Sequence, residues 1–180
     1  MVILLLLLAL FGFGSGVLLD AGSEESGPGT PSQQRPPAVE LETAAGTQRG
    51  VEGSYCVTDS AAGVGTCADA AGPIRPREVS IVRPGEPVVL RLAGAESAGG
   101  TATVRRLGCE ERVAGVELAG RETEWRVELP EGAYELAVFA TFAAGSASGD
   151  TSGVLGLVVD AEAPLEVRRA PPPGGGCGAG

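Results

Sequence analysis

Histidine and lysine are both missing from this chain of 180 residues, and aromatic residues make up only 4% of it. Without an imidazole the chain cannot build a Ser-His-Asp or Cys-His catalytic centre. Without an ammonium group it cannot build a lysine Schiff base or a phosphate-binding P-loop. We therefore expect a protein that is not an enzyme, and we keep hydrolysis by paired carboxylates as the remote catalytic alternative.

The charge balance argues against a nucleic-acid partner. All thirteen basic residues are arginines, and the formal net charge is -10. Binding to a phosphate backbone depends on a basic surface, which an acidic chain of this kind does not predict. The sequence also shows no pattern typical of a metal site or a cofactor site, so we expect neither.

The first nineteen residues form an apolar run, in which positions 2–19 carry no charge. Such a run at the start of a chain predicts a membrane-targeting helix. It is either a signal peptide cleaved near residues 14–16 or an anchor, since roughly 17 to 25 apolar residues are needed to cross a bilayer. Both alternatives place the rest of the chain outside the cytoplasm, secreted or anchored to the membrane.

Composition divides the remaining chain into three parts. Residues 20–50 are rich in Ser, Glu, Gly, Pro and Thr, which predicts a disordered linker. Residues 170–180 read Ala-Pro-Pro-Pro-Gly-Gly-Gly-Cys-Gly-Ala-Gly and predict a disordered Pro/Gly tail. The folded domain is therefore expected at 51–169.

Apolar residues in that domain alternate with polar ones, which is typical of half-buried strands. Two such stretches, 123–129 and 134–142, flank the turn Pro130-Glu131-Gly132 and are expected to pair as a hairpin. Shorter stretches of the same kind bring the total to about seven or eight strands, and no helical periodicity appears. The domain is predicted to be an all-β antiparallel sandwich.

The turn before Tyr134 favours an immunoglobulin-like form of this sandwich. In such domains a tyrosine placed just after a turn donates its hydroxyl hydrogen to nearby backbone. We assign Tyr134 this structural role. Trp125 lies on the alternating apolar face of its strand and is expected in the core.

The chain has four cysteines, at positions 56, 67, 109 and 177. Cys56 and Cys67 flank a Gly-containing loop, and in an exported protein we expect a disulfide between them. Zinc binding is the disfavoured alternative, because further thiolate or imidazole ligands at suitable spacing are missing. Cys109 and Cys177 are expected to be free or only loosely paired.

Two parts of the chain resemble a known group of proteins. The residues concerned are Gly53-Ser54-Tyr55-Cys56, Gly65-Thr66-Cys67-Ala68-Asp69 and Gly72-Pro73, followed by Gly132-Ala133-Tyr134-Glu135-Leu136-Ala137-Val138-Phe139-Ala140 and Gly149-Asp150. Over about residues 50 to 160 the chain resembles small exported bacterial proteins of unknown function. The resemblance implies an extracytoplasmic β domain with the first disulfide and implies no activity. Val57 is a departure, since an aromatic residue often follows the cysteine in that group.

Phe139 is the candidate contact residue. It points away from Tyr134 and Leu136 on the same strand, so we expect it to be exposed. The predicted function is a non-enzymatic envelope or secreted binding module. The alternative is a structural or interaction domain that docks to another envelope protein through a sheet edge or the surface around Phe139. The expected partner is thus an envelope protein or polymer.

Overall fold

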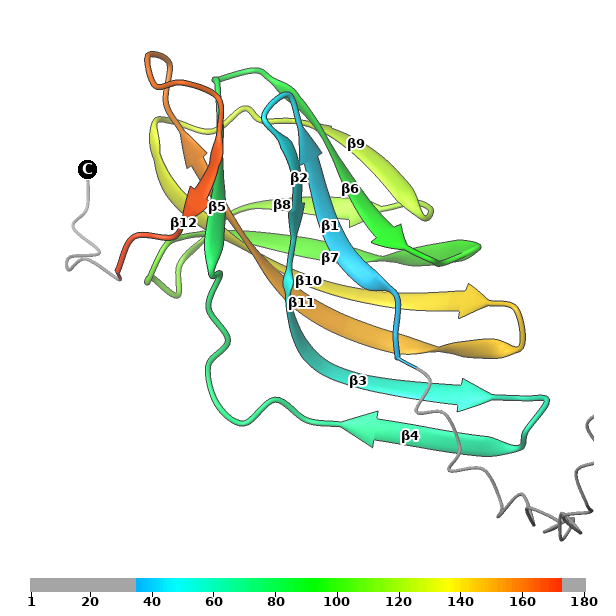
Figure 1. Cartoon of the computed structure of the whole chain (residues 1–180). Coiled ribbons are helices and arrows are strands. Elements are labelled where there is room, and N and C mark those ends of the chain that lie inside the picture. Colours follow the sequence, from blue (N-terminus) through cyan, green and yellow to red (C-terminus); the bar gives the residue numbers. More distant parts are fainter. Residues whose placement is uncertain (1–34, 173–180) are drawn as a thin grey trace, which may run out of the picture. The chain divides into compact units, whose positions relative to one another are not determined.

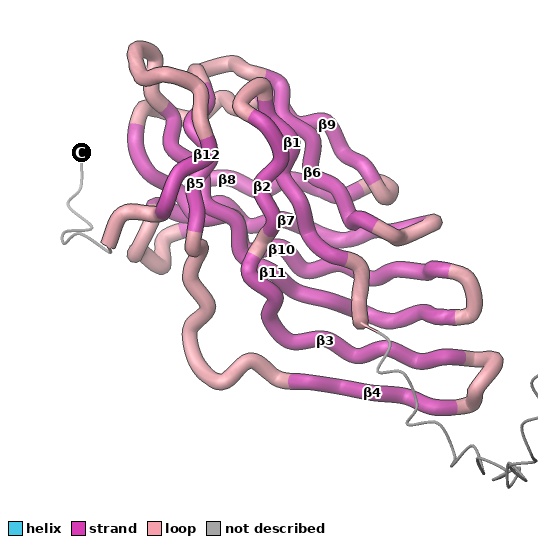
Figure 2. Tube along the Cα trace, viewed as in Figure 1, coloured by secondary structure: helices cyan, strands magenta, loops and turns pink. Residues whose placement is uncertain are grey.

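The structure is a computed structural model that describes residues 35–172 (Figure 1). Its regular elements are all β-strands, and Figure 2 shows strands joined by loops without a helix in this part of the chain. The apolar helix expected at 1–19, residues 20–34 of the expected linker and residues 173–180 of the expected tail lie outside the described residues. The all-β prediction is confirmed.

Twelve strands form two sheets in this part of the chain. The four-stranded sheet has the order β2-β1-β6-β9, with β1 at Ala38–Thr43, β2 at Gly46–Arg49, β6 at Pro87–Ala93 and β9 at Glu122–Arg126. The eight-stranded sheet contains the path β12-β5-β11-β10-β7-β8, and β3 joins β11 to β4. Its strands are β3 (Val51–Asp59), β4 (Val64–Ala68), β5 (Glu78–Val82), β7 (Ser97–Arg106), β8 (Arg112–Leu118), β10 (Gly132–Ala144), β11 (Ala147–Val159) and β12 (Val167–Arg169).

Strands β10 and β11 form the centre of the larger sheet as one long hairpin. Gly145 turns the chain between them at φ 58°, a left-handed conformation that glycine adopts without steric cost. The free side of β11 is shared by two partners. Its first half pairs with β3, and residues 157–159 pair with β5 in parallel.

The core lies between the two sheets, as expected for a sandwich. The smaller sheet contributes apolar side chains from β1 and β6, and the larger sheet contributes them mainly from β10 and β11. The principal buried residues are Val39, Leu41, Val88, Leu90, Leu92, Leu136, Val138, Ala140, Phe142, Leu155 and Leu157. Trp125 is partly buried against this core, which agrees with the structural role expected for it.

The expected linker ends earlier than predicted, because β1 and β2 fall inside 20–50. Strand β2 reads Gly-Thr-Gln-Arg and buries a polar side chain, Gln48. The Gln48 amide donates to the Glu78 carbonyl and accepts from the Ser80 hydroxyl. A strand held by buried hydrogen bonds shows no apolar alternation, so the sequence pattern missed it. The strands number twelve within residues 35–172, against the predicted seven or eight.

The predicted hairpin between 123–129 and 134–142 is wrong. Strand β9 pairs with β6 in one sheet, and β10 pairs with β7 and β11 in the other. Pro130 has no N–H group, and the chain crosses between the sheets at this point instead of turning back on itself. The Tyr134 hydroxyl donates to the Pro130 carbonyl at 2.7 Å and is buried. The predicted hydrogen bond of Tyr134 to nearby backbone is therefore confirmed.

Candidate functional site

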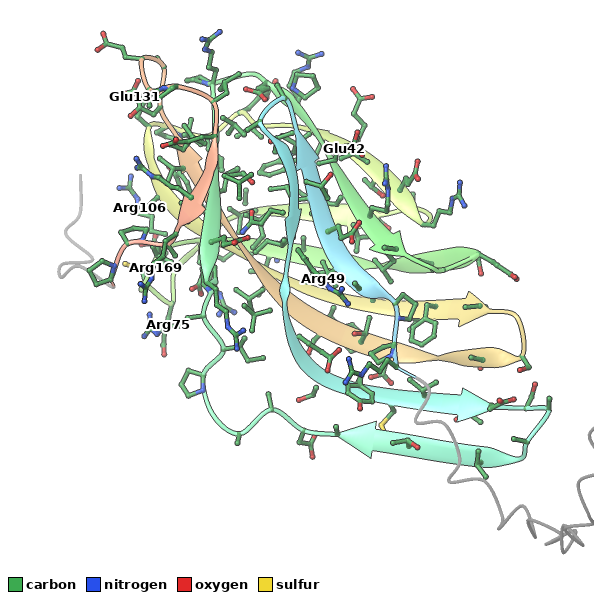
Figure 3. The ribbon with its side chains drawn as sticks, viewed as in Figure 1. Glu42, Arg49, Arg75, Arg106, Glu131 and Arg169 are labelled. Carbon is green, nitrogen blue, oxygen red and sulfur yellow. A yellow bond between two sulfur atoms is a disulfide. The ribbon has the colours of Figure 1, made fainter. Side chains whose placement is uncertain are left out.

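The outer face of the four-stranded sheet carries a ladder of alternating charges. Arg49, Glu40, Arg91 and Glu122 lie opposite one another across all four strands. The Arg91 guanidinium pairs with Glu122 at 3.2 Å and with Glu42 of the next row at 2.5 Å. Figure 3 shows Glu42 and Arg49 on this part of the domain. Such a face is well solvated and offers little to an apolar contact.

The outer face of the eight-stranded sheet is nearly neutral around its centre. In the strand register Phe139 of β10 lies between Thr101 of β7 and Ser152 of β11. Phe139 is 53% exposed, the most exposed of the large apolar side chains in the described part of the chain. The predicted exposure of this residue is therefore confirmed. We call this surface, formed by the outward side chains of β7, β10 and β11, the neutral face.

A groove of about 520 Å³ opens on the neutral face, on the side of Phe139 toward the start of β10. Its floor includes Glu135 and Ala137, the two preceding outward positions of that strand. One wall is the loop between β4 and β5, and the other is the turn after β7. The lining residues are Ser54, Ala70, Gly72, Pro73, Ile74, Arg75, Arg105, Gly108, Cys109, Glu110, Glu135, Ala137, Val138, Ser152, Gly153 and Val154.

Hydrogen bonds hold the first wall in place. The Ala70 amide donates to the Ser54 hydroxyl at 3.1 Å, and the Ser152 hydroxyl donates to the Ser54 carbonyl at 2.9 Å. Gly53 allows close packing here, since a Cβ on it would lie 2.7 Å from the Ile74 side chain. One hydrogen bond and this close packing thus hold the wall against β3, which the Ser152 hydroxyl joins to β11.

Three charged groups meet in the groove. Glu135 and Arg105 are direct partners across β10 and β7, and Arg75 approaches from the loop. Burial raises the pKa of Glu135, while the charges of Arg105 and Arg75 partly oppose that shift. The Arg105 Nε atom is buried and has no hydrogen-bond partner among the described residues.

The disulfide between Cys56 and Cys67 is present, as predicted. Cys56 lies opposite both Cys67 and Asp150, so the bond ties the edge strand β4 to the neutral face. Cys109 is disulfide-bonded as well, so of the two alternatives expected for it, free or loosely paired, the free one is wrong. Cys177 lies outside the described residues.

The structure separates the residues singled out from sequence. Phe139 faces solvent beside the groove, whereas Tyr134 and Trp125 belong to the corner and the core. Sequence reasoning did not identify Glu135, Arg75 and Arg105 as site residues. Alternation along β10 could have placed Glu135 on the same face as Phe139, but no local pattern marks the two arginines.

In the part of the chain that the structure describes, no group of three or more His, Cys, Asp or Glu side chains could hold a metal ion. None of the described residues belongs to a helix long and apolar enough to cross a membrane. The chain matches no family model, no curated protein and no solved structure.

Proposed function

We propose that this chain is a non-enzymatic binding module that works outside the cytoplasm, with the neutral face as its contact surface. The observation that carries the proposal is Phe139, an aromatic side chain left 53% exposed beside the groove. Burying such a side chain against a ligand contributes about 1.5 to 3 kcal/mol. The ligand is an envelope polymer or protein, and the domain is a sandwich of the immunoglobulin-like type.

Two features support this assignment. The Cys56–Cys67 disulfide suits an oxidising compartment, since cytosolic proteins rarely keep disulfides. The Tyr134 hydrogen bond to Pro130 is the contact that defines a tyrosine corner in immunoglobulin-like domains.

The binding test uses the whole purified chain, immobilised and exposed separately to isolated cell-wall polymer and to solubilised envelope proteins. We expect one of the two fractions to be retained, and Phe139→Ala to weaken retention by about tenfold or more. The matched control is Val113→Ala, which truncates another exposed apolar side chain on the edge strand β8. Equal retention by the wild type and Phe139→Ala would refute the neutral face as the contact surface.

The second candidate is docking of a protein partner through the edge strand β4. This strand reads Val-Gly-Thr-Cys-Ala, carries no charge and, among the described strands, pairs only with β3. Val64 at its start is 50% exposed. An uncharged edge presents free N–H and C=O groups to which a partner can add a strand. Here Val64→Lys should abolish retention of envelope protein, whereas Phe139→Ala should not.

A further inference from the structure

A second cavity, of about 410 Å³, lies next to the groove and is lined by three arginines. Arg75 and Arg77 come from the segment before β5, and Arg169 is the last residue of β12. The other lining residues are Pro76, Leu107, Ala170 and Pro171. No carboxylate of the described residues lines this cavity, which we call the arginine pocket.

Backbone contacts fix the positions of these arginines. The Ala170 amide donates to the Arg77 carbonyl at 2.8 Å, which holds the end of β12 beside the start of β5. Pro76 is buried between two of the arginines, and its ring restricts the backbone there. The three arginine side chains are therefore attached to a fixed backbone, which lowers the entropic cost of binding a ligand.

None of the three arginines forms an ion pair within 4.0 Å in the described part of the chain, although the charge of Arg75 acts on Glu135 in the groove. The ion pairs found there use Arg91, Arg121 and Arg168. Glu78 lies opposite Arg169 in the strand register, but its carboxylate is not within 4.0 Å of that guanidinium. A chain of net charge -10 could neutralise its arginines easily, so three unpaired ones around one cavity are unexpected.

More positive charge lies at the same end of the domain. Figure 3 draws Arg75, Arg106 and Arg169 toward one end. Arg75 also lines the groove, where the Arg105 Nε atom lacks a partner among residues 35–172. The groove also contains two carboxylates, Glu110 and Glu135, so the excess of positive charge that attracts anions lies at the arginine pocket.

We propose that the arginine pocket binds a phosphate group. A guanidinium presents its N–H donors in a planar fork that matches two oxygens of a phosphate or carboxylate. Three such forks favour a dianion with three free oxygens over a carboxylate with one charge and two oxygens. The cavity exceeds the volume of a single phosphate, so the group can be free phosphate or the phosphate of an ester.

The test is calorimetric titration of the whole chain with inorganic phosphate and, separately, with glycerol phosphate. Both are titrated at about pH 8, where phosphate monoesters are dianions, and at constant ionic strength. We expect saturable binding of at least one ligand. Tighter binding of the ester would identify an esterified phosphate as the ligand, and tighter binding of inorganic phosphate would identify the free anion. Equal binding would show that the pocket recognises the phosphate group alone. Absence of binding to both would overturn the proposal.

Variants locate the site. Arg169→Gln and Arg75→Gln should each weaken binding about tenfold or more, because each removes a charge-assisted contact. Arg169→Lys keeps the charge and loses the fork, so its affinity should fall between those of the wild type and Arg169→Gln. Arg83→Gln is the matched control, since it removes one exposed positive charge from the turn after β5.

Two further measurements keep the result interpretable. Thermal denaturation should show unchanged folding in every variant, since the substituted side chains are exposed. Phe139→Ala should keep full phosphate affinity. The phosphate site and the proposed role of the neutral face can therefore be tested independently of each other. Equal weakening by Arg83→Gln and Arg169→Gln would show a general charge effect and would overturn the arginine pocket.

Discussion

The outer faces of the two sheets differ in how their exposed side chains are paired. On the four-stranded sheet, Arg91 is paired with two carboxylates, Glu42 and Glu122. On the eight-stranded sheet, Phe139 stands exposed and the Arg105 Nε atom is unpartnered within the described residues. Unpartnered Nε atoms occur on both faces, since Arg91 Nε also lacks a hydrogen-bond partner in the described residues, so the faces differ in ion pairing and in exposed apolar area. Exposed apolar area on a sheet face marks a surface where a ligand gains by binding.

The same contrast appears within the eight-stranded sheet. The end of β11, where residues 157–159 pair with β5, is covered on its outer side by the segment around Pro76, whereas the centre of the sheet near Phe139 is exposed. This covering segment also carries Arg75 and Arg77. The arginine pocket therefore lies at the border between the covered part of this face and the open part.

The largest effect is expected where the covering segment touches β11. A Cβ on Gly156 would lie 2.5 Å from the Glu78 carbonyl oxygen and 2.6 Å from the Val79 side chain. We expect Gly156→Ala to lower the free energy of unfolding by about 2 to 3 kcal/mol, because backbone atoms must move apart. Denaturant unfolding followed by tryptophan fluorescence measures this change.

Gly99→Ala is the matched control on the open part of the same face. The Cβ added there would lie 3.7 Å from the Leu118 carbonyl oxygen, an ordinary contact distance. Its free energy of unfolding should stay within about 0.5 kcal/mol of the wild type. Equal destabilisation by the two substitutions would show that the covered and open parts do not differ in packing.

A smaller effect is expected at the corner through which the chain passes from one sheet to the other. Tyr134→Phe removes the hydroxyl that donates to the Pro130 carbonyl at 2.7 Å, and stability should fall by about 1 kcal/mol. Tyr55→Phe serves as control, because the Tyr55 hydroxyl makes no hydrogen bond within 35–172. An unchanged unfolding midpoint for Tyr134→Phe would remove the corner as a stabilising contact.

The central strand of the fold was predictable because its burial follows its sequence. Along β10, Leu136, Val138 and Ala140 alternate with Ala137 and Phe139, and the structure buries the first set and leaves Phe139 exposed. Strand β2 was not predictable in this way, since its buried side chain is the polar Gln48. The Gln48 hydrogen bonds to β5 add to its pairing with β1, and no local pattern reveals them.

The candidate site was only half predictable for a related reason. The exposure of Phe139 was predicted from the alternation of side chains along its strand alone. Arg105 lies opposite Glu135 because β7 pairs with β10, and Arg75 lines the groove because the loop after β4 returns along the sheet. Those positions depend on the order of strands in the sheet. The hairpin predicted between 123–129 and 134–142 is wrong, which shows that the turn residues did not determine that order. Electrostatic sites assembled across strands therefore need the topology before they can be recognised.

The charge ladder should contribute less than the corner. Arg91→Gln breaks two partly exposed ion pairs, and we expect a loss of at most about 1 kcal/mol at low salt. At about 1 M salt the loss should nearly disappear, because the Debye length falls to about 3 Å. Arg49→Gln, on the same face but without an ion pair in the described residues, is the control. A loss for Arg91→Gln that persists at high salt would show that this face is held by packing instead of charge.

The smallest effect is the pH dependence of Glu135 on the neutral face. Burial raises the pKa of its carboxyl above the ordinary value of 4.5, with Arg105 and Arg75 opposing the shift. A raised folded-state pKa means that the folded protein binds the proton more tightly than the unfolded chain does. The resulting contribution to stability is fully present below the ordinary pKa and is lost as the pH rises through the folded-state pKa.

Stability differences between the wild type and Glu135→Gln measure this contribution, since the variant cannot titrate at that position. The wild type should lose stability relative to the variant as the pH rises from about 4 through the folded-state pKa of Glu135. Carbon NMR titration of the Glu135 carboxyl gives the pKa directly. In Arg105→Gln the pKa should rise further, because a neighbouring positive charge is gone, whereas Arg49→Gln on the opposite face should leave it unchanged. A pKa below 4.5 in the wild type would mean that the two arginines lower the pKa of Glu135 more than burial raises it. Glu135 would then be held by neighbouring arginine charge, as Glu42 is in the charge ladder.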